Sequence, residues 1–257
     1  MIPESELILN PDGTIYHLNL LPDHISDTIL TVGDPARVAQ VSRHFDSIEF
    51  EGVHREFVTH VGYYRGKRLT VLSTGMGTDN IDIVMNELDA LVNIDFMSRT
   101  VRPPEERLSL RIIRLGTSGS LQPDVPVGAL LATQHAVGLD SLMQFYPLVE
   151  TGLETRNGQG LAAAPGPARR ALRGAWGRPT ARAASRRPAH RQHRDLPRLL
   201  RASGPPPAPR PAHARLHAAP AETSATRAPE GNFRLSNFEM ETAGYYALGQ
   251  LLGHQVL

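Results

Sequence analysis

The sequence of 257 residues contains no cysteine, which excludes a disulfide framework, a thiolate metal site and a cysteine nucleophile. Aromatic residues make up only 5% of it, and no apolar stretch approaches the ~18 residues of a membrane span. Its beginning, MIPESELILNPDG, carries acids and a proline where a signal peptide has a basic region and an apolar run. We therefore expect a cytoplasmic protein with no membrane partner.

The net charge of +1 conceals an uneven distribution of charge. The window from Arg156 to Pro229 holds 15 arginines and two acids, whereas the rest of the chain holds 12 Lys or Arg and 24 acids. Ala, Pro and Arg supply 46 of the 74 residues in this window, which therefore buries too little apolar surface to offset the entropy of ordering. We expect disorder or loose helix there, within a single domain formed by residues 1–257.

Outside that window the pattern is typical of an α/β protein. Strands are predicted at 28–32 and 111–115, each ending at a glycine turn, and a hairpin at 57–63 and 69–72. Helices are predicted over 36–45, 78–94 and 239–252. The second helix has an apolar stripe, formed by Ile81, Val84, Met85, Leu88 and Leu91. Strands that end in glycine turns before helices place ligands at the carboxyl edge of a sheet.

Three glycine turns are candidates for an anion site. Gly33 would let backbone N–H groups approach an oxyanion beside Arg37, although Asp34 could equally make this turn a simple capped helix start. The turn at 73–77 precedes a helix in the same way. Arg114 is predicted near the end of a core strand, where a guanidinium is costly to bury unless it meets an anion. The alternative is that Arg114 lies at the surface in an ion pair. The residues alone leave these alternatives open.

Six motifs follow one another along the chain: IYHLNL, TVGDPARV, HREF, STGMG, RLGTSGSLQPDVPVG and NFEMETAGYYALG. In this order the sequence resembles the nucleoside phosphorylase superfamily, in particular its uridine phosphorylase branch, over residues 15–147 and 232–257. The resemblance implies a three-layer α/β/α fold around a mixed, partly closed central sheet. It also implies homodimers, or hexamers built from dimers, with shared active sites.

The resemblance further implies site residues and a reaction. It assigns phosphate binding to Gly33, Arg37, Arg55, Arg114 and Thr117, with Arg55 supplied by the adjacent subunit. It assigns ribose binding to Glu239, Met240, Glu241 and His17, which crosses the dimer interface. Arg114 and Glu241 are the implied catalytic groups in a substitution at the anomeric carbon through an oxocarbenium-like sugar. Inorganic phosphate is the co-substrate, and neither a metal nor another cofactor is implied.

The expected activity is phosphorolysis of a nucleoside, uridine by resemblance, to the free base and ribose 1-phosphate. A purine nucleoside phosphorylase and a nucleosidase of the same superfamily are alternatives, although a nucleosidase uses water and needs no cluster of three arginines. A third alternative is an inactive remnant whose basic window binds RNA. That window has Trp176 as its only aromatic residue, so we do not expect a nucleic-acid partner.

The basic window replaces the segment that forms the base pocket in the family. The F…Q…R arrangement of pyrimidine-specific members is not found there, and the family's last strand and helix would lie beyond Leu257. We hypothesise a shifted reading frame over 156–229, because the composition changes abruptly at both ends and GC-rich codons yield Ala, Arg, Pro and Gly in any frame. Back-translating 193–204 with permitted codons and reading one nucleotide later gives TATCPGFYGPQ, which has the expected Phe and Gln. The gene sequence tests this hypothesis.

Overall fold

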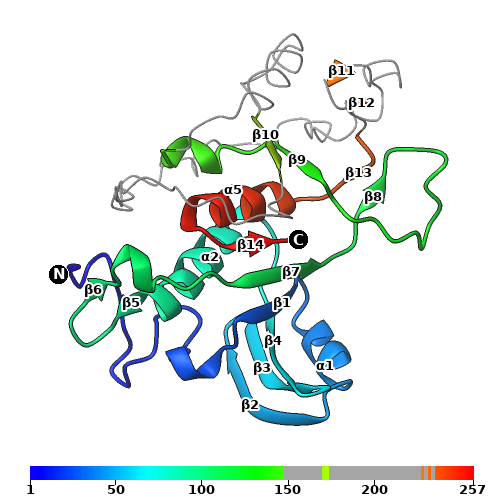
Figure 1. Cartoon of the computed structure of the whole chain (residues 1–257). Helices are drawn as coiled ribbons and strands as arrows, with labels where there is room; N and C mark the ends of the chain where they lie inside the picture. Colours follow the sequence, from blue (N-terminus) through cyan, green and yellow to red (C-terminus); the bar gives the residue numbers. More distant parts are fainter. Residues whose placement is uncertain (148–169, 174–226, 229–230, 233–234) are drawn as a thin grey trace, which may run out of the picture.

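The computed structural model describes residues 1–147, 170–173, 227–228, 231–232 and 235–257. Its main feature is a mixed six-stranded sheet in the order β14-β7-β1-β4-β3-β2 (Figure 1). The strands are β1 (Thr28–Val32), β2 (Ser47–His54), β3 (Phe57–Tyr64), β4 (Lys67–Ser73), β7 (Arg111–Leu115) and β14 (Gln255–Val256). Neighbours from β14 to β4 run parallel, whereas β3 and β2 are added antiparallel.

Helices cover both faces of this sheet. On one side Leu30 and Val71 pack with α1 (Ala36–Ser42), and on the other Ile29 and Leu72 belong to the large core that includes α2 (Thr78–Asn93) and α5 (Thr242–Leu252). Successive residues of a strand point to opposite faces, so this division places one helix layer on each side. The three-layer mixed α/β fold expected from the sequence is therefore confirmed.

The core between α2, α5 and the sheet is apolar and closely packed. All five predicted stripe residues of α2 are buried, as are Tyr245, Ala247 and Leu248 on α5. Burying a large aliphatic side chain contributes roughly 1.5–3 kcal/mol, so this face holds both helices on the sheet. The predicted hairpin and the strands at 28–32 and 111–115 are also confirmed.

The strand β2 is absent from the sequence-based prediction. Apolar and polar residues alternate only over Ser47–Glu51 in SIEFEGVH, Gly52 and Val53 interrupt the pattern, and most side chains of the strand are exposed. Its pairing with β3 depends on Gly62, because a Cβ there would lie 2.2 Å from the carbonyl oxygen of Ser47. Formation of β2 therefore depends on its pairing with β3.

Shorter elements surround the sheet. The 3-10 helices are η1 (Pro22–His24), η2 (Pro104–Glu106) and η3 (Leu142–Phe145). Four two-stranded ladders pair β5 (Ile94–Asp95) with β6 (Thr100–Val101), β8 (Gly119–Ser120) with β13 (Asn237–Phe238), β9 (His135–Gly138) with β10 (Arg170–Arg173), and β11 (Arg227–Ala228) with β12 (Gly231–Asn232). The β8–β13 ladder joins the segment after β7 to the segment before α5.

Two expectations need correction. The sheet is not closed in the part of the chain that the structure describes: β14 and β2 are its edges, and β8 and β9 pair in separate ladders. The short strands β10 and β11 lie inside the window expected to lack regular structure. They form because their backbone groups pair with β9 and β12. The remainder of 156–229, including the hypothetical reading-frame shift, lies outside the described residues.

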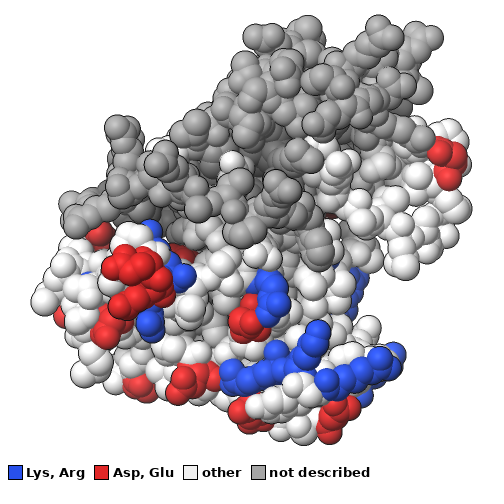
Figure 2. Space-filling model, viewed as in Figure 1, with Lys and Arg blue, Asp and Glu red and all other residues white. Residues whose placement is uncertain are grey.

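The surface charge of the described part is mixed. On the face shown in Figure 2, basic side chains gather over α1 and the strands β2 to β4, and acidic ones near β5 and β6. Acidic side chains border the basic group on this face. Among the described residues, no helix is both long and apolar enough to cross a membrane.

Candidate active site

The carboxyl ends of three parallel strands bring the three predicted glycine turns together. Val32 at the end of β1 is in register with Ser73 of β4 and with Leu115 of β7. The first two turns approach closely, since a Cβ added at Gly33 would lie 3.3 Å from the carbonyl oxygen of Gly75. This edge is where an open α/β sheet places its ligand.

Arg114 lies at this edge and meets two carboxylates. Its Nη2 is 3.2 Å from Oε2 of Glu239 and makes a short hydrogen bond to Oε2 of Glu241. The three side chains are 17%, 15% and 9% exposed, so the charges are mostly withdrawn from water. A buried guanidinium requires a compensating negative charge, and the two carboxylates supply it. Burial of Arg114 therefore does not by itself require an external anion.

The two glutamates precede α5 instead of lying within it. The predicted helix over 239–252 begins at Thr242, because Glu239 folds over the helix start and accepts hydrogen bonds from the backbone N–H of Glu241 and Thr242 at 2.9 Å each. Capping a first turn with a carboxylate stabilises its free N–H groups. Glu241 Oε1 accepts a further hydrogen bond, 2.9 Å long, from the N–H of Gly77 at the start of α2.

The guanidinium of Arg114 is folded back over its own strand end. A Cβ at Gly116 would lie 2.0 Å from Nη1 of Arg114, so glycine provides the space that the guanidinium occupies. Beneath it, burial raises the pKa of Tyr245 to about 12, with the charge of Arg114 acting in the opposite direction. The phenol is therefore neutral at physiological pH.

The first glycine turn shows one of the two alternatives that the sequence left open, the capped helix start. Asp34 Oδ1 accepts a 2.9 Å hydrogen bond from the N–H of Ala36, as expected of a capped helix start. Arg37 stands half-buried in the first turn of α1, and Thr117 is exposed beyond β7. Neither side chain makes a hydrogen bond or ion pair with another described residue. The assignment of Arg37 and Thr117 to a phosphate site stays a prediction.

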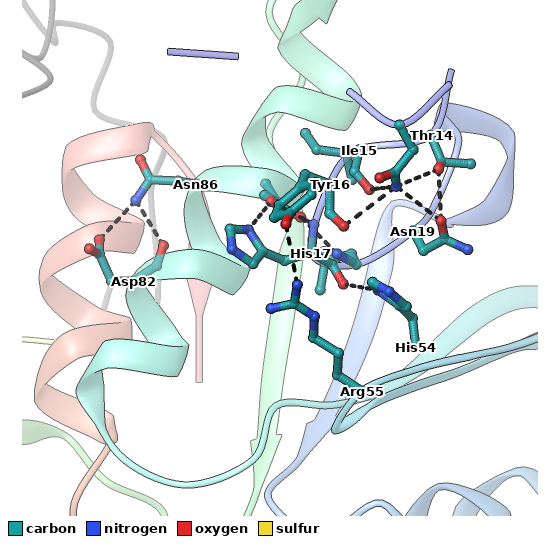
Figure 3. Close-up of polar contacts among 12 residues, drawn as sticks. Thr14, Ile15, Tyr16, His17, Asn19, His54, Arg55, Asp82 and Asn86 are labelled. Atoms are coloured by element: carbon teal, nitrogen blue, oxygen red, sulfur yellow. Dashed lines mark hydrogen bonds and ion pairs between the residues drawn. The ribbon is translucent and has the colours of Figure 1, made fainter. Parts of the chain in front are cut away.

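His17 and Arg55 form a second group around Tyr16 (Figure 3). The Arg55 guanidinium lies 5.4 Å from the centroid of the Tyr16 ring, and His54 Nδ1 donates to the carbonyl oxygen of His17 at 2.8 Å. No hydrogen bond or ion pair among the described residues links this group to Arg114. The turn that carries Arg55 nevertheless touches the same sheet edge, since a Cβ at Gly75 would lie 3.3 Å from Cγ of Glu56.

Glu87 contacts His17, one of the predicted site residues, and was not singled out from the sequence. Its carboxylate accepts hydrogen bonds from Nδ1 of His17 at 2.6 Å and from the N–H groups of His17 and Leu18 at 3.1 and 2.8 Å. A donating Nδ1–H leaves Nε2 of a neutral imidazole free to accept a hydrogen bond from a hydroxyl. The only signal in the sequence is an acid beside the apolar stripe of α2.

Two methionines are exposed beside the carboxylates. Met240 precedes Glu241 and is 57% exposed, and Met76 precedes Gly77 and is 77% exposed. The hydrogen bond between Gly77 and Glu241 holds these two turns together. No group of His, Asp or Glu side chains in the described ranges is placed to hold a metal ion.

Known proteins are similar to this chain in sequence. A uridine phosphorylase of Thermococcus kodakarensis is 32% identical over 139 residues, which are 54% of this chain and 44% of that protein. A DeoD-type purine nucleoside phosphorylase of Thermoanaerobacter sp. is 33% identical over 110 residues, 42% of this chain and 41% of that protein. The chain thus spans less than half the length of these curated relatives.

Solved structures share the fold over more of the chain. The Trypanosoma brucei nucleoside phosphorylase, described as showing uridine phosphorylase activity, has a TM-score of 0.73 and 28% identity, covering 97% of this chain and 88% of that one. The Vibrio fischeri uridine phosphorylase, at 15% identity, has a TM-score of 0.51 over 93% of this chain and 80% of its own, and is similar in fold. The family model described as Phosphorylase superfamily matches residues 27–257. The six ordered motifs and the mixed α/β sheet agree with this match, and the chain belongs to the phosphorylase superfamily.

Proposed function

We propose that the protein cleaves the N-glycosidic bond of uridine with inorganic phosphate, giving uracil and ribose 1-phosphate. The observation that carries the proposal is the meeting of Arg114 with Glu239 and Glu241 at an edge made of glycine turns. A guanidinium suits a phosphate dianion, and fixed carboxylates suit the hydroxyls of a sugar. The site thus offers adjacent places for an anionic nucleophile and a ribose.

The roles of the individual residues follow from this arrangement and from the family resemblance. Phosphate would be held by Gly33, Arg37, Arg114, Thr117 and Arg55, the last from an adjacent subunit. Ribose would be held by Glu239, Met240, Glu241 and His17, the last also from an adjacent subunit. Glu87 orients His17 so that Nε2 accepts from the 5′-hydroxyl.

The reaction is a substitution at the anomeric carbon. A phosphate oxygen forms the new bond to C1′ while the bond from C1′ to the base nitrogen breaks, and the electron pair leaves with the base. The base takes up one proton, which balances the proton that hydrogen phosphate loses when it becomes the phosphate ester. Positive charge develops on the sugar in the transition state, and the phosphate beneath the ring and the carboxylate of Glu241 stabilise it. Arg114 and Glu241 are therefore the proposed catalytic residues, and no metal or other cofactor is required.

We propose uridine, and not a purine nucleoside, as the substrate. The relatives support this choice, since uridine phosphorylases of Thermococcus kodakarensis and Haemophilus influenzae match 139 and 137 residues, whereas purine nucleoside phosphorylases match 110 to 130. The small difference keeps purine nucleosides as the second candidate. The segment expected to form the base pocket lies mainly outside the described residues, so the choice depends on relatives and not on pocket geometry.

The proposal extends to the organisation of the protein. We propose one catalytic domain over residues 1–257, acting in the cytoplasm as a dimer or as a hexamer built from dimers. Arg55 is exposed and rests on Tyr16, which leaves its guanidinium accessible to a neighbouring subunit. Dimers with a two-fold axis let each chain give Arg55 and His17 to the other chain's site.

The test is product analysis with and without phosphate. The protein is incubated with uridine, with inosine or with no nucleoside, and the sugar product is resolved from free ribose. Formation of ribose 1-phosphate from uridine only when phosphate is present supports the proposal. Equal release of free ribose without phosphate would identify a nucleosidase, and faster phosphorolysis of inosine would identify a purine enzyme.

A further inference from the structure

The group proposed to bind phosphate and the group proposed to bind ribose are bound to each other. Arg114 Nη2 contacts Oε2 of both Glu239 and Glu241, and Glu241 directs its other oxygen to the N–H of Gly77. The Arg114-facing oxygen of Glu241 is thus engaged by a cation. A ribose hydroxyl that uses this oxygen must compete with Arg114.

The carboxylates are the fixed side of this contact. Glu239 is bound to the N–H groups of Glu241 and Thr242, and Glu241 is bound to that of Gly77, so each is anchored on a helix start. Among the described residues, the side chain of Arg114 contacts only these two carboxylates through hydrogen bonds or ion pairs. When the contact opens, the guanidinium is therefore the group that moves. Its position beside the carboxylates is possible because Gly116 has no Cβ.

We propose that the Arg114–Glu241 ion pair couples the two substrate sites, so that binding of the anion increases the affinity for the nucleoside. This inference rests on the proposed function. An anion that attracts the guanidinium weakens its hold on Glu241, which frees a carboxylate oxygen to accept from ribose hydroxyls. Coupling between two binding sites is reciprocal, so the nucleoside increases the affinity for the anion by the same factor.

Sulfate is a suitable probe because it is a dianion that does not yield a ribose phosphate. Uridine binding to the full chain is measured by calorimetry with and without sulfate, and sulfate binding with and without uridine. We expect at least a roughly fivefold gain in each affinity, the lower end of typical coupling. Independent binding of the two ligands would overturn the inference and leave the proposed function intact. Failure of the protein to bind either ligand or to phosphorolyse uridine would overturn both.

Two variants separate the ion pair from general electrostatics. Glu241→Gln loosens the contact, so sulfate should bind several-fold more tightly in the absence of uridine. Glu56→Gln removes a carboxylate from the same sheet edge, one with no ion pair to Arg114 among the described residues, and should change sulfate affinity less than about twofold. Equal tightening in both variants would show that only net charge matters and would overturn the inference.

A third variant changes no charge. Gly116→Ala places a Cβ where Nη1 of Arg114 lies and so displaces the guanidinium from Glu241. Uridine should then bind more tightly than to the parent protein in sulfate-free buffer, and sulfate should no longer improve its binding. An unchanged dependence on sulfate, with circular dichroism showing a folded variant, would contradict the role of the ion pair.

Discussion

Arg114 and Glu241 are 127 residues apart in the chain and form an ion pair where β7 ends and α5 begins. The register of β7 with β1 places Arg114 beside Thr31 at the carboxyl edge of the sheet, and the ladder of β8 with β13 brings the glutamates to it. The four predictions that follow test this pair and the groups around it.

Replacing Arg114 with alanine should lower kcat/KM for phosphorolysis by roughly 100- to 1000-fold, as expected for loss of a positioned charge in a desolvated site. The matched control is Arg111→Ala on the same strand. Arg111 is 55% exposed and paired with Asp27, so its removal should change kcat/KM only a few-fold. Steady-state kinetics with both substrates varied decides the point, and similar losses in the two variants would contradict the assignment of Arg114.

Glu87→Ala should raise KM for uridine while changing kcat less, because His17 loses the acceptor that holds its ring. His17→Ala should have a similar effect. The comparison substrate is 5′-deoxyuridine, which lacks the hydroxyl that His17 is proposed to bind. With this substrate neither variant should differ from the parent by more than about twofold. An equal loss with both substrates would indicate that Glu87 serves folding alone.

An Arg55→Ala variant and an Arg114→Ala variant should each lose most of their activity, and mixing them with subunit exchange should restore part of it. If each chain gives Arg55 to its neighbour, a mixed dimer has one intact site, and random exchange of equal amounts restores about a quarter of the parent activity. Mixing without exchange is the control. If Arg55 serves the site of its own chain, no recovery will occur.

The pH dependence of stability should include a contribution from Tyr245. Its pKa is raised from 10.0 to about 12 by burial, so the folded state keeps the phenolic proton that the unfolded state loses first. This contribution, roughly 2–3 kcal/mol of unfolding free energy, is present below pH 10 and is lost as the pH rises to about 12. Urea titrations between pH 8 and about 12 measure it.

Tyr245→Phe removes the buried phenolic hydroxyl, which lies beside the hydroxyls of Thr31 and Thr74. The variant should lose no more than about 1.5 kcal/mol of unfolding free energy near pH 8, the contribution of a typical hydrogen bond, and should lose roughly 2–3 kcal/mol less than the parent as the pH rises to about 12. Tyr63→Phe, which changes an exposed tyrosine, is the control and should follow the parent curve. A parallel decline of all three proteins would contradict the assignment.

Much of the fold could be predicted from the sequence because the determining signals are local. The β-branched run at 28–32, the glycine turns and the apolar stripe of α2 each depend on neighbours within a few residues. Elements with weaker local patterns were missed or misplaced. The exposed strand β2 forms because β3 offers a pairing edge, and α5 starts at Thr242 because Glu239 caps it.

The site shows the same division. The sequence by itself determined which residue types stand at the ends of β1, β4 and β7, and its ordered motifs identified the superfamily. Only the tertiary structure decided that Arg114 binds the carboxylates before α5 and that Glu87 holds His17, since both contacts join segments about 70 or more residues apart. Such contacts depend on the register of strands and the packing of helices, which sequence periodicity does not encode.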